Sequence, residues 1–247
     1  MRFLILSDIH SNSEGLDAVL TDAAGRYDAA VCCGDVVGYN PDPVHAIEWC
    51  RNNCQSIIRG NHDKVVAGIE DLDWFNPVAQ ASARWTMKQL ADDHMNYLRE
   101  LPKGPLTVSD AFQIFHGAPF DEDEYVLTPD TAEECFSHLE SSVAFFGHTH
   151  VQGGFFQKHR RLGGVGRPGP GNSELVLELE TNTMYIINPG SVGQPRDRDP
   201  RAAYAIYDSD EHLVRLRRVE YDVAKTAEKI NAAGLPDALG LRLFDGQ

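Results

Sequence analysis

The sequence predicts an α/β fold in which helices connect the strands of a parallel sheet. Three short apolar runs near the N-terminus, residues 3–6, 29–33 and 56–58, are typical of buried strands. Two segments with helical spacing of apolar residues, 13–24 and 41–52, separate these runs. Parallel neighbours require a crossover connection, so this strand–helix–strand–helix–strand order indicates a parallel sheet.

Capping residues support the two helices of this opening unit. Ser11 or Ser13 can accept a hydrogen bond from the first turn of the first helix, and Gly25 follows at the position where a helix commonly ends. Pro41 stands near the start of the second helix, where a missing main-chain N–H is tolerated.

The remainder of the chain is expected to add further helices and short strands. Helices are predicted at residues 77–92, 95–100 and 129–139, and a last one from about residue 222. Strands are predicted at residues 106–108, 112–115, 143–146, 155–156, 174–179, 184–187, 203–207 and 214–220. Residues 163–172 contain five Gly and two Pro, so we expect an exposed, flexible loop over 163–171 within a single domain spanning 1–247.

Composition limits the classes of protein to which the chain can belong. Hydrophobic residues make up 42% and charged residues 24% of the 247, which is ordinary for a globular protein. A formal net charge of −15 argues against bulk nucleic-acid binding, which requires a basic surface. The apolar run before Ser7 is too short to cross a membrane, so we expect no membrane partner. Monomer and dimer both remain open.

The five cysteines indicate a reducing location. None forms a CxxC pair, and Cys32 and Cys33 lie in an apolar run where cysteine behaves as a small buried hydrophobe. Cys50 and Cys54 share a helix face, but no second ligand pair favours a metal or disulfide role for them. We therefore predict a cytoplasmic protein.

Polar residues of one chemical kind follow the predicted strands. They occur in the fragments Asp8-Ile9-His10, Gly34-Asp35, Gly60-Asn61-His62-Asp63, His116-Gly117 and Gly147-His148-Thr149-His150. The carboxyl ends of strands in an α/β sheet converge on one crevice, so these fragments are expected to meet there. Side chains of Asp, Asn and His bind divalent cations through oxygen and nitrogen. On an extended strand end, D-x-H and H-x-H spacing would place both side chains on the same face.

Each fragment alone is weak evidence, because Asp after Gly usually marks a turn and a lone His usually lies on the surface or in a satisfied core. Their combination at successive strand ends favours a metal site. The other histidines lie in helical or polar contexts and are not expected to be ligands: His45, His94, His138, His159 and His212.

This ordered set of fragments resembles the calcineurin-like metallophosphoesterase superfamily, and within it the small bacterial and archaeal single-domain phosphodiesterases. The segment NPGSVGQPRDRDPRAAYAIYD is similar to the closing segment of that group. The resemblance covers residues 2–221, whereas 163–171 and the tail after Asp222 have no firm counterpart.

The resemblance implies a four-layer α/β/β/α sandwich of two mixed sheets flanked by helices, with a dinuclear metal site at the strand ends. It implies two divalent ions, with manganese or iron favoured and zinc, cobalt or nickel as alternatives. By the same resemblance, one ion is held by Asp8, His10 and His150, the other by Asn61, His116 and His148, and Asp35 bridges both.

The implied activity is phosphoester hydrolysis, with phosphodiesters favoured and a nucleotide as one substrate class. The resemblance implies that a hydroxide shared by the two ions attacks phosphorus, and that His62 protonates the leaving oxygen. Asp63 is expected to orient His62 and raise its pKa. The alternatives are a phosphomonoesterase acting on proteins or small molecules, a dinucleoside polyphosphate hydrolase, or a metal-binding scaffold subunit. The scaffold is disfavoured because every ligand and the proton donor are present.

Three residues outside the ligand set are weaker candidates for substrate contact. Asn12 could contact the substrate or cap the helix that follows it. Tyr39, with Asn40, could line the mouth of the pocket. Arg196 could bind phosphate oxygens, or it could belong to a self-paired surface in the sequence RDRDPR.

Overall fold

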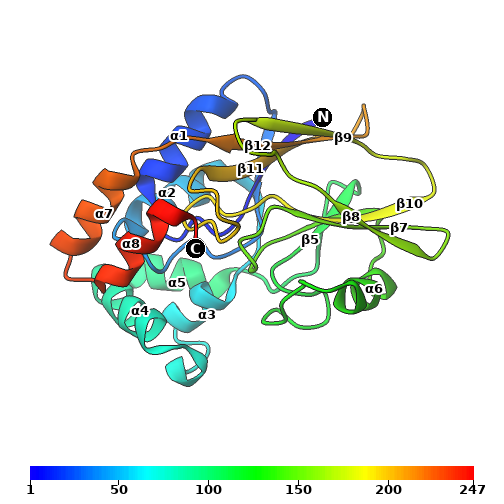
Figure 1. Ribbon diagram of the computed structural model, residues 1–247. Coiled ribbons are helices and arrows are strands. Elements are labelled where there is room, and N and C mark those ends of the chain that lie inside the picture. The colour runs from blue at the N-terminus through cyan, green and yellow to red at the C-terminus, as the bar shows by residue number, and fades with distance from the viewer.

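Two six-stranded sheets form the centre of the computed structural model, which describes all 247 residues (Figure 1). The first sheet has the order β3 (Cys54–Ile57), β2 (Ala29–Cys32), β1 (Arg2–Leu6), β11 (Ala202–Asp208), β12 (Leu213–Val219) and β9 (Glu174–Glu178). The second has the order β4 (Leu106–Val108), β5 (Phe112–Phe115), β6 (Val143–Phe146), β10 (Thr183–Asn188), β7 (Gly153–Lys158) and β8 (Arg161–Val165). Strands β1, β2 and β3 are parallel, as predicted, while β11, β12 and β9 add antiparallel neighbours.

Helices cover the outer face of each sheet. The helices of the chain are α1 (Ser13–Ala23), α2 (Pro43–Asn53), α3 (Asn61–Val66), α4 (Pro77–Gln89), α5 (Asp92–Glu100), α6 (Pro129–Ser137), α7 (Val223–Ala232) and α8 (Asp237–Asp245), with a 3-10 turn η1 (Leu72–Trp74) before α4. Helices α1 and α2 pack on the first sheet, α7 packs on α1, and α6 packs on the second sheet (Figure 1). The four-layer sandwich is therefore confirmed. No helix has the length and apolar character needed to cross a bilayer.

The alternation of side chains along β1 explains why the first sheet lies between two cores. Phe3 and Ile5 belong to the core between the sheets, whereas Leu4 and Leu6 belong to the core beneath the helices. Successive side chains of a strand point to opposite faces, so an uninterrupted apolar run is required where both faces are covered. Strand β1 thereby leads straight from the packed interior to Asp8 at its carboxyl end.

The second sheet is built in the same way. On β6, Val143 and Phe145 face the first sheet, while Ala144 and Phe146 pack towards α6. The ring of Phe145 lies 5.5 Å from that of Tyr207 on the facing sheet, measured between centroids. Aromatic packing between Phe145 and Tyr207 thus holds the two sheets against each other.

The Gly/Pro-rich stretch differs from its prediction in one respect. Gly163, Gly164 and Val165 form part of β8, which pairs with β7, so the connecting segment starts at Gly166. The ring of Phe156 lies over Gly163, where a Cβ would come within 2.3 Å of it. Two adjacent glycines interrupt the hydrophobic alternation of β8, which is why the sequence pattern did not reveal this strand.

Other boundaries also differ. Helix α3 was not predicted, although it carries Asn61 and His62 at its start, and α8 was not separated from α7. The predicted helix 77–92 ends at Gln89, and the next begins at Asp92 rather than at residue 95.

We expect Phe145→Ala to lower the free energy of unfolding by about 3–5 kcal/mol, because it opens a cavity between the two sheets. The matched control is Leu241→Ala on α8, whose side chain is 67% exposed, with an expected change below about 0.5 kcal/mol. Urea unfolding measures both, and an equally small loss in the two variants would contradict the packing described for the inter-sheet core.

Candidate metal centre

Five of the seven candidate ligands lie on left-handed turns shortly after the strands. The main-chain φ angles are 52° at Asp8, 46° at His10, 54° at Asp35, 64° at His148 and 57° at His150. Such values are uncommon outside glycine and cost about 1–3 kcal/mol each. The expectation that D-x-H and H-x-H remain extended is therefore wrong. The side chains converge because the chain turns sharply at each strand end, and not because they alternate along a strand.

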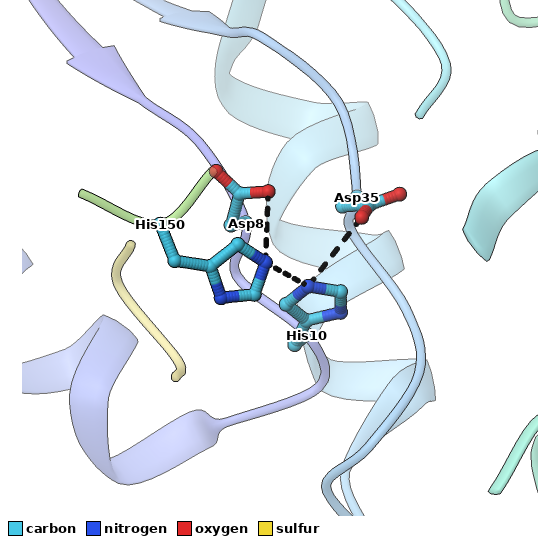
Figure 2. Close-up of side chains that lie close together, drawn as sticks. All are labelled: Asp8, His10, Asp35 and His150. Atoms are coloured by element: carbon cyan, nitrogen blue, oxygen red, sulfur yellow. Dashed lines mark hydrogen bonds and ion pairs between the residues drawn. The ribbon is translucent and has the colours of Figure 1, made fainter. Parts of the chain in front are cut away.

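Four of these side chains form a buried cluster (Figure 2). Atom Nε2 of His150 lies 3.1 Å from Nε2 of His10 and 3.3 Å from Oδ1 of Asp8. Nε2 of His10 lies 3.4 Å from Oδ2 of Asp35. The cluster thus combines residues that follow β1, β2 and β6, which belong to both sheets.

A second cluster shares Asp35 with the first. Oδ2 of Asp35 also lies 3.4 Å from Nε2 of His116, which follows β5. Oδ1 of Asn61 contacts Nε2 of His116 at 3.1 Å and Nδ1 of His148 at 3.0 Å. The structure therefore brings all seven predicted ligands into two adjoining groups with one carboxylate in common.

Main-chain carbonyl groups fix how each histidine is oriented. A carbonyl oxygen only accepts a hydrogen bond, so the ring nitrogen that contacts it must carry the proton. The four contacts are His10 Nδ1 to Val37 O at 3.0 Å, His116 Nδ1 to Cys33 O at 2.8 Å, His150 Nδ1 to Gln194 O at 2.6 Å and His148 Nε2 to Asp123 O at 3.0 Å. In a neutral ring the other nitrogen then presents a lone pair to the cluster.

These lone pairs face one another, which is unfavourable unless a cation or a proton lies between them. Nε2 of His10 and Nε2 of His150 are 3.1 Å apart, and Oδ1 of Asn61 is wedged against two further ring nitrogens. Ligands bound at about 2.1 Å to one ion lie about 3.0–3.4 Å from each other, so these spacings match a coordination shell. The residues present therefore fit divalent cations.

Burial sets the protonation states of the cluster. It holds the pKa values of His10 and His150 well below the ordinary range and lowers that of His148 to about 3, so these rings are neutral. At His116 burial also acts to lower the pKa, but the Asp35 carboxylate outweighs it and raises the value to about 10. The position between His116 and Asp35 thus attracts positive charge.

His62 lies beside the clusters without joining them. Its buried ring packs against Tyr39, Phe75 and His10 at centroid distances of 4.3, 4.5 and 4.8 Å. Its Nδ1 has no hydrogen-bond partner, and its main-chain N–H donates to Oδ1 of Asp35 at 2.8 Å. Gly38 permits this packing, because a Cβ there would lie 2.5 Å from Nδ1. The ring borders the cavity described below.

The role expected for Asp63 is not what the structure shows. Its carboxylate accepts hydrogen bonds from the main-chain N–H groups of Gly60, Val36 and Val37 at 2.9, 3.2 and 3.1 Å, and it accepts none from the ring of His62. Asp63 therefore ties the start of α3 to the loop after β2. Burial lowers the pKa of His62 to about 4, which is the opposite direction to the one expected.

A cavity of about 440 Å³ opens over the clusters and includes Tyr39 and Arg196 in its wall. The guanidinium of Arg196 donates to the hydroxyl of Tyr39 at 3.2 Å and to Oε1 of Gln194 at 2.9 Å, with no carboxylate partner. Arg201, by contrast, pairs with Asp199 at 2.6 Å. The self-paired surface expected for the RDRDPR sequence thus includes Arg201 but leaves Arg196 available to the cavity.

Asn12 takes the capping alternative. Its Oδ1 accepts from the main-chain N–H of Gly15 at 2.9 Å, and its Nδ2 donates to the carbonyl of Gly193 at 3.0 Å. The side chain does not line the cavity, so the substrate contact considered for it is corrected.

Sequence reasoning also missed Trp74 and Tyr125 in the cavity wall, since they lie in segments without a motif or a periodic pattern.

Comparisons with known proteins agree with this geometry. Residues 1–212 match the calcineurin-like phosphoesterase superfamily domain. The chain is 37% identical over 252 residues to the uncharacterised protein MJ0912 of Methanocaldococcus jannaschii, covering 98% of this chain and 97% of that one. The crystal structure of a metallophosphoesterase from Sphaerobacter thermophilus aligns with a TM-score of 0.86 at 38% identity, over 100% and 99% of the two chains. Hypothetical protein PH1004 from Pyrococcus horikoshii OT3 shares the fold, with a TM-score of 0.75 at 20% identity over 100% and 98%.

Removal of the shared carboxylate should weaken binding at both clusters together. We expect Asp35→Asn to lower the affinity for the two ions by at least about 10- to 100-fold, the loss typical even of residues that only orient ligands. His148→Ala should affect one ion only. Metal content after dialysis against a weak chelator measures both, with His45→Ala, an exposed histidine paired with Asp17, as the control. Full retention of two ions by Asp35→Asn would contradict a bridging position.

Proposed function

The chain belongs to the calcineurin-like phosphoesterase superfamily, and we propose that this metallophosphoesterase is a phosphodiesterase. The observation that carries the proposal is the pair of ligand clusters joined by Asp35 beneath a cavity that also presents Arg196 and His62. Three kinds of group therefore converge on one volume: cation ligands, a fixed guanidinium and an imidazole with a free nitrogen.

The proposed cofactors are two divalent cations, with manganese or iron favoured by the mixture of carboxylate, amide and imidazole donors, and zinc, cobalt or nickel as alternatives. When bound, the ions supply a hydroxide nucleophile at neutral pH and stabilise charge on the phosphoryl oxygens. The proposed ligands are Asp8, His10 and His150 for one ion, Asn61, His116 and His148 for the other, and Asp35 for both.

Arg196 and His62 are proposed to act on the substrate. The planar guanidinium of Arg196, held by Tyr39 and Gln194, is suited to a phosphoryl oxygen. His62 is proposed to donate the proton to the leaving oxygen through Nε2, since its ring borders the cavity and its Nδ1 is buried against Gly38. A bound phosphoester brings negative charge next to the ring and so favours its protonated form.

Charge and space favour a diester over a monoester. A diester carries one negative charge, whereas a monoester carries up to two, and the outer wall of the cavity bears the carboxylates of Glu70, Asp71, Asp121 and Asp123. The volume of about 440 Å³ is that of a small-molecule site and holds a second ester arm beside the phosphoryl group.

The proposed location is the cytoplasm. Four of the five thiols are buried and free, the state that a reducing compartment maintains: Cys32, Cys33, Cys50 and Cys135.

A substrate panel tests the proposed reaction. With added manganese, we expect kcat/KM for bis(p-nitrophenyl) phosphate to exceed that for p-nitrophenyl phosphate by about tenfold or more, which corresponds to about 1.4 kcal/mol. A preference for the monoester would make the protein a phosphomonoesterase. Selective hydrolysis of diadenosine tetraphosphate would establish the polyphosphate alternative, and either result would overturn the proposal.

We expect His62→Ala to slow hydrolysis of alkyl or ribose esters by about 10²–10⁴-fold, because an alkoxide leaves only when it is protonated. Hydrolysis of nitrophenyl esters should fall far less, since nitrophenolate is a stable anion. Kinetics on two substrates that differ only in leaving group, with metal content measured in parallel, provide the comparison.

The matched control for this prediction is His94→Ala on α5, a histidine outside the cavity. An equal loss on both substrates, together with loss of an ion, would show that His62 is a ligand and not the proton donor.

A further inference from the structure

The outer wall of the cavity carries two exposed aromatic rings. Trp74, at the end of η1, is 86% exposed, and Tyr125 is 46% exposed, yet both line the cavity that contains Asp35. The ring of Tyr125 stacks on that of His148 with centroids 4.0 Å apart, so this wall begins immediately beside the proposed ligands. Aromatic side chains that line a cavity supply faces on which a ligand can pack.

The same wall carries carboxylates that the protein does not neutralise. Lys64 is buried and pairs with three acids: Glu70 at 2.6 Å, Glu122 at 3.5 Å and also Asp123. Asp71 and Asp121 line the cavity and take part in no ion pair. The lining of the cavity therefore includes carboxylates without an ion-pair partner as well as exposed aromatic side chains.

This combination recognises a particular chemistry. An alkylammonium group is attracted to the faces of Trp and Tyr by the ring quadrupole, and nearby carboxylates add a direct electrostatic attraction. The inner end has the opposite preference, because Arg196 and the proposed cation ligands favour an anion. The two ends of the cavity thus match the two charges of a zwitterion.

We propose that the substrate is a zwitterionic phosphodiester whose second ester arm carries an alkylammonium group held by Trp74, Tyr125, Asp71 and Asp121. The proposal rests on the phosphodiesterase function proposed above and names its substrate class. The phosphoryl group occupies the inner end of the cavity, and the four outer residues determine specificity without taking part in bond cleavage.

Three p-nitrophenyl phosphodiesters test the proposal, because they differ only in the second arm: choline, its uncharged isostere 3,3-dimethylbutyl, and the anionic 2-carboxyethyl. We expect kcat/KM to be highest for the choline ester, by about 2- to 30-fold over the isostere, the range that a cation–aromatic contact supplies. The carboxyethyl ester should be the poorest substrate. Equal values for the choline ester and its isostere would overturn the proposal.

Variants of exposed residues test whether the preference for the choline ester depends on the residues of the cavity wall. Trp74→Ala should remove most of the preference for choline, again about 2- to 30-fold, and change the isostere less. Asp71→Asn should lower the choline rate by about threefold at low salt, and by less as salt screens the charge. Asp73→Asn is the matched control, since Asp73 is an exposed acid of the same segment that does not line the cavity. An equal effect of Asp71→Asn and Asp73→Asn would show that the cavity wall does not determine the preference for the choline ester.

Binding provides a readout that does not depend on turnover. Choline chloride should quench tryptophan fluorescence saturably in the wild type and not in Trp74→Ala, whereas 3,3-dimethylbutanol should bind more weakly. Identical titrations for the two compounds would contradict the proposal.

Glycerophosphocholine in solution and phosphatidylcholine vesicles distinguish a soluble ester from a lipid headgroup as the source of the arm. If none of the three nitrophenyl diesters is hydrolysed, the phosphodiesterase function fails, whereas hydrolysis without preference refutes only the substrate class.

Discussion

The Asp35 carboxylate contacts histidines that follow strands of both sheets. Its Oδ2 lies 3.4 Å from His10, which follows a strand of the first sheet, and 3.4 Å from His116, which follows a strand of the second. Its Oδ1 accepts the main-chain N–H of His62 at 2.8 Å. Gly60 is required beside it, because a Cβ there would lie 2.1 Å from Oδ1. The relative placement of the sheets, fixed by the aromatic core between them, therefore sets the spacing of the donor atoms.

The main chain prepares this site as much as the side chains do. Each ligand histidine contacts a main-chain carbonyl group, and two of these groups, those of Cys33 and Val37, lie on the segment between β2 and α2. Five ligands lie on left-handed turns. Conformations of this cost persist only where surrounding structure enforces them. The packed strands on both sides of the inter-sheet core enforce these conformations. The proposed ligands lie just beyond the ends of those strands.

Much of this arrangement follows from local patterns in the sequence. The apolar run at β1 and the helical spacing of α1 predicted parallel strands, and the order of polar fragments at strand ends predicted which residues meet. The four layers and the division of ligands came from the family resemblance. Local patterns could not reveal β8, whose glycines show no alternation, or the partners of Asp63, which lie on a distant loop. The aromatic wall was missed because Trp74 and Tyr125 meet only through the tertiary fold.

The loop that contains Asp121 and Tyr125 has two connections to the centre. The carbonyl of Asp123 orients His148 at 3.0 Å, and the ring of Tyr125 stacks on the same histidine. A change in this loop that alters which substrate arm is accepted will therefore also move a proposed metal ligand. Among relatives of this protein, substrate range and metal affinity should diverge together, and a graft of this loop alone from one relative to another should transfer both traits or neither.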